Sequence, residues 1–195
     1  MIVQLKSLFY KYRIWGWRTS QGLALFLANL VTFAHPESLY MLKNSLLRAA
    51  GIKIKGRIFI DRGFRCLFPE NLSIEDGVAF GHDIHIWAFA PIQIGRHTKI
   101  AKDLLIISGS HDVESYENLS GQEVVIGPGC WIGARVTILG GVKIGKGCVI
   151  GACSLVKNDI PDWSVAVGVP ARVIRERVPA EKNFTRFGVY SPEDI

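Results

Sequence analysis

Residues 126–156 read IGPGCWIGARVTILGGVKIGKGCVIGACSLV, and this stretch decides the fold. An aliphatic residue recurs at every sixth position, and a small or aliphatic residue follows most of them four places later. An α-helix repeats after about 3.6 residues and a strand after about two, so neither has this period. A short strand followed by a tight turn does fit a period of six. The series is Ile126, Ile132, Ile138, Ile144, Ile150 and Val156.

Six consecutive matches make a chance run in an ordinary β-rich protein a poor explanation. The same spacing occurs earlier in the chain, in two further blocks. We therefore predict an all-β fold, a left-handed parallel β-helix, in which the aliphatic residues point inward and each coil covers its neighbour. The earlier blocks are Ile74, Phe80 and Ile86, and Ile94, Ile100 and Ile106.

The first part of the chain follows a different pattern, which is typical of helices. Residues 1–17 mix aromatic and basic side chains, and residues 22–34 form an uninterrupted apolar run. A bilayer span needs roughly 20 apolar residues, so this run is too short to cross alone. After Pro36, residues 37–50 resemble a second helix. We expect three parts: a helical, amphipathic segment over 1–51, the β-helix over 52–177, and a C-terminal tail over 178–195.

Two interpretations of the helical segment stay open. One is an amphipathic anchor at the inner face of a membrane, and the other is a cap that covers the open end of the β-helix or packs in an oligomer. The two are compatible with each other. Basic residues outnumber acidic ones by 23 to 17, which gives a net charge of +6. This balance is explained by solubility alone or by an anionic cofactor such as CoA, an acidic polysaccharide or an anionic membrane surface. Nucleic acid is not expected as a partner, because no recognition motif is visible.

The four cysteines form no CxxC pair, and no cleavable signal peptide precedes them. We therefore expect a cytoplasmic location, reduced and buried thiols, and no metal site. Cys130 and Cys148 are separated by three hexads, which make one coil, so they should stack on neighbouring coils. A disulfide would fit that spacing in principle, but we expect two small apolar fillers. The other two cysteines are Cys66 and Cys153.

The six-residue period breaks twice. The step from Ile86 to Ile94 is longer than one hexad, and the step from Ile106 to Ile126 is longer than three. The second break inserts a polar loop, SGSHDVESYENLSGQE over residues 108–123, which contains His111. A histidine has an ordinary pKa of about 6.5, which suits a general base for a hydroxyl nucleophile. A lone loop histidine is also often a solvated surface residue, but its place in the long interruption favours catalysis.

From about residue 72 to 177 the chain resembles the hexapeptide-repeat acetyltransferase superfamily. The SGSHD motif is similar to the loop of the catalytic histidine in the polysaccharide branch, and residues 128–177 are similar to the C-terminal block of the family. The resemblance points to the O-acetyltransferases of colanic-acid, capsule and lipopolysaccharide synthesis and to the galactoside and maltose acetyltransferases. It implies a homotrimer with acetyl-CoA between adjacent subunits, and direct transfer of acetyl to a saccharide hydroxyl with His111 as the base.

The resemblance also implies roles for individual residues. Small residues line the pantetheine arm of the cofactor, cations bind its phosphates, and a tryptophan stands near the active site or packs at the trimer interface. The chain reads Val156-Lys157-Asn158-Asp159 where the family often has Val-Thr-Lys-Asp, so the lysine is displaced by one position. The implied cofactor-binding residues are Ala134, Ala152, Lys157, Arg172, Arg175 and Trp131, and the implied substrate contacts are Asp83, His85, Trp87 and Asp112.

Two other functions are weighed against this one. The γ-class carbonic anhydrases use the same fold with three metal-binding histidines, but the five histidines here contain no H-x4-H pair. A non-catalytic trimeric scaffold for a membrane-associated glycan assembly would need neither the His111 loop nor the C-terminal block. The histidines are His35, His82, His85, His97 and His111.

Overall fold

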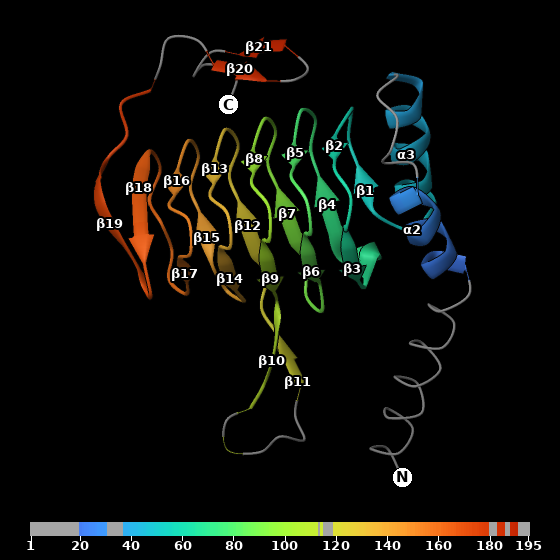
Figure 1. The fold of residues 1–195 in the computed structure, drawn as a ribbon. Helices are drawn as coiled ribbons and strands as arrows, with labels where there is room; N and C mark the ends of the chain where they lie inside the picture. The colour runs from blue at the N-terminus through green and yellow to red at the C-terminus, as the bar shows by residue number, and fades with distance from the viewer. Residues whose placement is uncertain are drawn as a thin grey trace.

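The computed structural model describes residues 20–30, 37–112, 114, 119–179, 183–185 and 188–190. In this part of the chain, short parallel strands wind through about five coils whose strands stack into three sheets, here called sheets A, B and C (Figure 1). The predicted all-β, left-handed parallel β-helix with an α-helical segment before it is confirmed. The expectations for residues 1–17 and 31–34 lie outside the described residues.

Each coil contributes one strand to each sheet, in the order A, B, C. Sheet A contains β1 (Lys53–Ile54), β4 (Leu72–Ile74), β7 (Ile92–Ile94), β12 (Val124–Ile126) and β15 (Lys143–Ile144). Sheet B contains β2 (Phe59–Ile60), β5 (Ala79–Phe80), β8 (Lys99–Ile100), β13 (Trp131–Ile132), β16 (Val149–Ile150), β18 (Ser164–Gly168) and β19 (Ala171–Glu176). Sheet C contains β3 (Arg65–Leu67), β6 (His85–Trp87), β9 (Leu105–Ile107), β14 (Thr137–Leu139) and β17 (Leu155–Val156).

The aliphatic series of the sequence forms the core. Ile126 pairs with Ile144, Ile132 with Ile150, and Ile138 with Val156, and the exposed fraction of each is at most 1%. Successive coils therefore stack their inward side chains directly on one another, as the period of six predicts. The residues between them face outward. The alternation in the sequence therefore separates the core of the β-helix from its outer surface, which is a three-sided prism formed by sheets A, B and C.

The coils are not all of one length. Cys66 pairs with Ile86 and Ile86 with Ile106, so two of the early coils are longer than the later coil that pairs Ile126 with Ile144. The extra residues follow a sheet-C strand, as a 3₁₀ turn over Pro69–Asn71 and as the bulge after Trp87. The long insertion after β9 falls at the same place. It contains the antiparallel hairpin of β10 (Gly109–His111) and β11 (Leu119–Gly121), which projects from the body (Figure 1).

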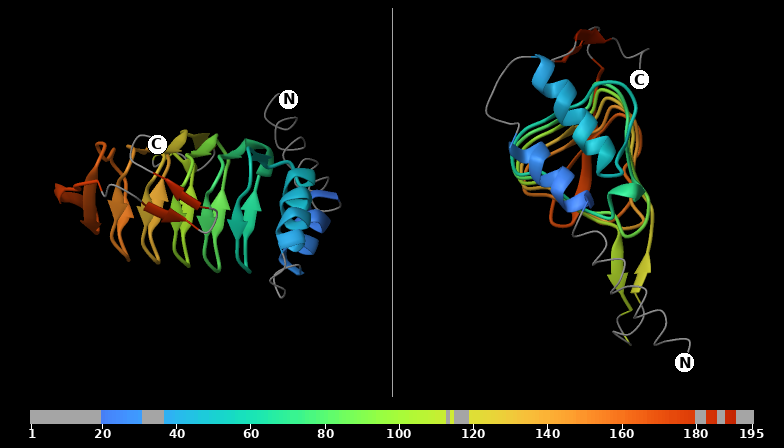
Figure 2. Two further views of the ribbon diagram at one scale, coloured as in Figure 1. Left: turned by 90° about the horizontal axis from the view of Figure 1, so that it is seen from above. Right: turned by 90° about the vertical axis from the view of Figure 1, so that its right-hand side faces the viewer.

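Both ends of the solenoid are finished differently from its middle. At the C-terminal end, β19 returns antiparallel to β18 and closes the solenoid. A second hairpin, of β20 (Asn183–Thr185) and β21 (Gly188–Tyr190), follows it. At the N-terminal end, helices α2 (Ser20–Leu30) and α3 (Glu37–Ala49) lie across the open first coil (Figure 2).

The two helices cover the end of the core. Ala28 and Leu47 are each 1% exposed, and both belong to the same continuous apolar cluster as the β-helix core. Asn29 fastens α2 to the first coil, since its side-chain amide donates to Phe64 O at 2.9 Å and accepts from Phe64 N at 3.0 Å. The capping interpretation therefore holds for α2 and α3. Neither of these helices is long and apolar enough to cross a bilayer.

The stacked cysteines behave as fillers. Cys130 and Cys148 are free thiols with exposed fractions of 1% and 0%, and they lie one coil apart because Trp131 pairs with Val149. A hydrogen bond with Cys148, together with burial, raises the pKa of Cys130 well above its ordinary value. The prediction of two buried thiols in place of a disulfide is confirmed, and Cys66 is buried as well. The expectation of a buried thiol is wrong for Cys153, which is exposed at a left-handed turn between a sheet-B and a sheet-C strand.

Candidate active site

His111 lies at the end of β10, on the projecting hairpin. It pairs with Leu119 across the hairpin, and its side chain is exposed to solvent. Its neighbour Asp112 accepts a hydrogen bond from Glu114 N at 2.9 Å, which forms a turn within the loop. The imidazole is therefore carried by a β-hairpin whose backbone is ordered at this point. Strand pairing positions His111, and the turn positions Asp112.

The base of the hairpin is anchored by residues that sequence reasoning missed. Ser108 is 1% exposed, its Oγ accepts from Ala90 N at 2.9 Å, and its backbone N donates to Trp87 O at 3.0 Å. The ring of Phe89 fills the space beside Gly109 and Gly121, so that a Cβ on Gly121 would stand 2.7 Å from Phe89 Cδ1. The sequence contained a signal for this contact. Its two breaks of the six-residue period follow β6 and β9, which are direct neighbours in sheet C, so the two inserted segments lie side by side.

A hollow of about 500 Å³ lies at the foot of the hairpin. It is lined by backbone and small side chains of the insertion and by the next coil, namely Ile107, Ser108, Gly109, Ser110, Ser120, Gln122, Leu139 and Gly140. Its size and its mixture of polar and apolar lining suit a small polar ligand.

The predicted cofactor residues lie elsewhere, mostly on one line along the solenoid axis. We call the turns between sheet-B and sheet-C strands corner BC. Ala134 and Ala152 occupy this corner on neighbouring coils, and Cys153 N donates to Ala134 O at 2.8 Å. Gly133 brings the two coils close together, because a Cβ there would stand 2.6 Å from Ala152 N. Arg172 lies further along the solenoid, on the closing strand β19, where it pairs with Val167 of β18.

Two further predicted residues lie on the outer face of sheet B beside this line. Trp131 is 57% exposed and pairs with Val149. Val149 in turn pairs with Val165, which pairs with Arg175. Trp131 and Arg175 therefore stand in one outward-facing row, next to the Ala134–Ala152 line.

Lys157 is separated from this group. We call the turns between sheet-C and sheet-A strands corner CA. Lys157 follows β17 and lies at this corner, and the hairpin of His111 leaves the solenoid at the same corner on another coil. Sheet C lies between the two corners, because β14 runs from corner BC to corner CA on the Ala134 coil and β17 does so on the Ala152 coil. A single chain therefore does not bring His111 and Lys157 together with Ala134, Ala152 and the two arginines.

The predicted substrate contacts span the width of sheet C. Asp83 lies at corner BC with a left-handed backbone, φ 58°. His85 faces outward and lines a hollow of about 290 Å³ together with Arg65 and Asp83. Trp87 stands at the corner-CA edge, and its carbonyl accepts the hydrogen bond from Ser108 at the hairpin base. Among the described residues, no three His, Cys, Asp or Glu side chains gather closely enough to hold a metal ion.

The comparisons with known proteins agree with the fold. The model of the bacterial transferase hexapeptide family (six repeats) matches residues 123–158. WcaF of Escherichia coli (strain K12), a candidate colanic acid biosynthesis acetyltransferase, is 36% identical over 147 residues, which are 75% of this chain and 81% of WcaF. The chain belongs to the hexapeptide-repeat acetyltransferases.

Solved structures give the same result. A maltose O-acetyltransferase from Clostridium difficile 630 superposes with a TM-score of 0.68 at 29% identity, over 83% of this chain and 88% of that one. A galactoside acetyltransferase in complex with coenzyme A superposes with a TM-score of 0.65 at 26% identity, over 90% of each chain. The similarity to acetyltransferases therefore extends over most of the chain.

Proposed function

We propose that the protein is an O-acetyltransferase that moves an acetyl group from acetyl-CoA to a hydroxyl of a saccharide, in the synthesis of a surface polysaccharide or related glycan. The observation that carries the proposal is the exposed imidazole of His111, held on a hairpin whose base is fastened by Ser108 and Phe89. The names of the relatives support the acceptor class, since they refer to colanic acid, maltose and galactoside.

The chemistry needs one base and no covalent enzyme intermediate. The acceptor hydroxyl gives its proton to His111 while its oxygen attacks the acetyl carbonyl carbon. The new C–O bond forms, the C–S bond of the thioester breaks, and the CoA sulfur leaves with the proton that His111 returns. A backbone N–H stabilises the negative charge on the carbonyl oxygen in between. Asp112 helps to orient the imidazole, and Asp83, His85 and Trp87 contact the acceptor.

Acetyl-CoA binds along corner BC in this proposal. Ala134 and Ala152 leave room for the pantetheine arm, where larger side chains would block it. Arg172 and Arg175 lie on β19, the strand that closes the solenoid, and their charges suit the phosphates of the cofactor. Trp131 lines the same side.

Assembly follows from the distribution of these residues. A base must come within hydrogen-bond reach of the reacting hydroxyl, yet His111 and the Ala134–Ala152 line lie at opposite corners of sheet C. We propose a homotrimer in which corner CA of one copy, with His111 and Lys157, meets corner BC of the next. Such a contact joins two different surfaces and closes into a ring.

The setting we propose is the cytoplasmic face of a membrane, which residues 1–50 contact. The support is an exposed apolar row on α2, where Leu23 and Leu30 are each 55% exposed. The division into parts at residues 51 and 177 also remains a proposal.

The test is release of CoA from acetyl-CoA, followed with a thiol reagent, in the presence of a panel of sugars and glycan intermediates. We expect acceptor-dependent release, and His111→Ala should lower its rate by about 10²-fold or more, a usual general-base contribution. Glu114→Ala is the matched control, because Glu114 is exposed on the same hairpin and has no assigned role. If wild-type protein fails to bind acetyl-CoA, the acetyltransferase proposal is wrong.

A further inference from the structure

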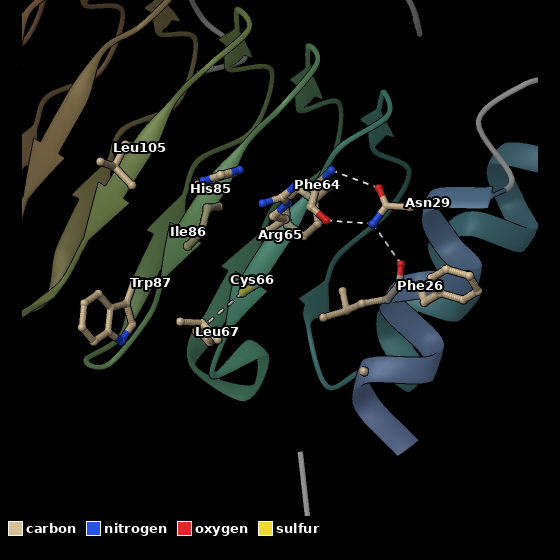
Figure 3. A pocket seen from close by; sticks show the side chains of 12 residues that line it. Phe26, Asn29, Phe64, Arg65, Cys66, Leu67, His85, Ile86, Trp87 and Leu105 are labelled. Carbon is tan, nitrogen blue, oxygen red and sulfur yellow. Dashed lines mark hydrogen bonds between the residues drawn. The ribbon is translucent and has the colours of Figure 1, made fainter. Parts of the chain in front are cut away.

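An apolar pocket lies between α2 and the outer face of sheet C (Figure 3). Its volume is about 560 Å³, which falls in the usual range for ligand sites of roughly 300–1,000 Å³. Helix α2 contributes Leu25 and Phe26, and the strands contribute Leu67, Trp87 and Leu105. Phe26 and Leu67 are 59% and 43% exposed. Large apolar side chains in solvent around a cavity of this size mark a binding surface.

Besides Asn29, whose amide is bonded to the backbone of Phe64, the pocket wall contains two polar side chains. Arg65 and His85 line the pocket and are direct neighbours on adjacent strands. Within the described residues, the Arg65 side chain makes no hydrogen bond or ion pair. The nearby carboxylate of Asp103 is already shared between Lys102 and Arg135, at 3.7 Å from each. Arg65 is therefore available to an anionic group of a ligand.

The charge beside the pocket is mixed. Arg65 and His85 line the pocket, and the carboxylates of Asp83 and Asp103 line the adjoining hollow with them. The guanidinium of Arg65 at the edge of an apolar cavity complements a molecule that has a negative headgroup and an apolar chain.

The pocket leads toward the hairpin of His111. Trp87 forms one wall of the pocket, and its carbonyl accepts the hydrogen bond from Ser108 N at the hairpin base. Leu105, which also lines the pocket, belongs to the strand β9 from which the hairpin leaves. Trp87 and Leu105 therefore line the pocket and also lie beside the base of the hairpin that carries His111.

We propose that this pocket binds the lipid part of the acceptor: a long apolar chain that carries the saccharide through a phosphate. The chain lies between Phe26 and the Leu67–Trp87 wall, Arg65 binds the phosphate, and the sugar extends toward the hairpin. The inference rests on the proposed acetyl transfer, and it specifies the acceptor as a phosphate-linked lipid in place of a free sugar. The exposed row of α2 gives such a ligand a route from a bilayer.

The test measures direct binding to the full-length protein, so it does not depend on activity. The probe is farnesyl phosphate, titrated by tryptophan fluorescence below its micelle concentration, with farnesol and inorganic phosphate in parallel. We expect farnesyl phosphate to bind at least about tenfold more tightly than farnesol, and inorganic phosphate not to bind measurably. No binding of farnesyl phosphate to the wild-type protein would overturn the proposal.

Two matched pairs of variants locate the site. Phe26→Ser should weaken binding about tenfold or more, whereas Leu30→Ser should not, since both are exposed on α2 but only Phe26 lines the pocket. Arg65→Gln should remove the preference for the phosphate, whereas Arg62→Gln should keep it. Equal losses within either pair would overturn the proposal, because they would indicate adsorption to the helix surface or to exposed basic side chains of the first coil in general.

The outcome is separable from that of the proposed function. Phe26→Ser should bind acetyl-CoA as the wild type does, and it should lose only the lipid probe. A protein that binds farnesyl phosphate through Phe26 and Arg65 but does not bind acetyl-CoA would contradict the acetyltransferase proposal and leave the lipid pocket intact.

Discussion

Lys43 shows how a single residue joins the helical cap to the β-helix. Its side chain is 2% exposed, and its Nζ donates to Asp61 O at 2.9 Å. The Asp61 carboxylate in turn lies 3.2 Å from His82 Nε2 on the next coil. Burial lowers the pKa of Lys43 from 10.5 to about 8, and the attraction of Asp61 only partly opposes that shift. At neutral pH the chain therefore contains a charged ammonium where removal from water is costly.

This leads to a prediction about pH. Because the pKa is about 8 in the folded chain and 10.5 when unfolded, the unfolded state binds more protons between these values, and stability rises with pH there. We expect the free energy of unfolding of the wild type, relative to Lys43→Met, to increase from pH 7 to pH 10 in urea titrations. Lys53→Met, an exposed position, is the control. A difference that stays constant with pH would refute the lowered pKa.

At the scale of elements, the hairpin β10–β11 depends on close packing against the coil before it. Gly109 and Gly121 both face Phe89, and Ser108 ties the strand entering the hairpin to the bulge after Trp87. The ring of Phe89 is held in turn by an edge contact with Phe68, at 5.8 Å between ring centroids. The direction of the hairpin, and with it the position of His111, is therefore set by the extra residues of the neighbouring coil.

A methyl group at Gly121 tests this arrangement. Its Cβ would stand 2.7 Å from Phe89 Cδ1 and 2.9 Å from Ala90 Cβ, so the hairpin must shift. We expect Gly121→Ala to lower kcat by about 10- to 10²-fold, because a displacement of about 1 Å suffices for such a loss. The Kd for acetyl-CoA and the Tm should stay close to those of the wild type. An unchanged kcat would show that the hairpin position does not limit the reaction.

At the scale of the whole molecule, the candidate site is divided between two edges of one sheet. Corner CA holds His111 and Lys157, and corner BC holds Ala134, Ala152 and the approach to the arginines. The prism is rigid, because its coils share one continuous core from the capping helices to the last strands. No bending of the chain can bring the corners together, so the proposed trimer is the simplest arrangement that completes the site.

Mixed oligomers test this division. His111→Ala lacks the base but keeps corner BC, and Ala152→Trp fills the cofactor line but keeps the base. Each alone should be nearly inactive, whereas trimers formed by co-expression at equal levels should regain about a quarter of wild-type activity, from interfaces that combine two intact corners. The measurement is acceptor-dependent CoA release by the purified mixture. Activity no higher than that of the separate variants would show that the site lies within one chain.

The roles of the predicted site residues remain predictions at every scale. The sequence identified His111 as a candidate base and the C-terminal block as a candidate cofactor site. Both signals are local, since one is a break in a strict period and the other is a motif of the family. It did not predict Ser108 and Phe89 as anchors or Arg65 as part of a pocket, because each acts through a contact with another coil or with α2.

By itself, the sequence determined the β-helix, the inward residues and the position of the insertion. A period of six leaves one way to bury every aliphatic side chain, so local pattern and tertiary fold coincide. The tertiary structure alone shows that α2 and α3 close the first coil, that Lys43 of α3 is buried against this coil, and that the candidate site residues fall at two corners. Amphipathic helices reveal an apolar face but not the surface that it meets, and coils of unequal length shift which residues become neighbours.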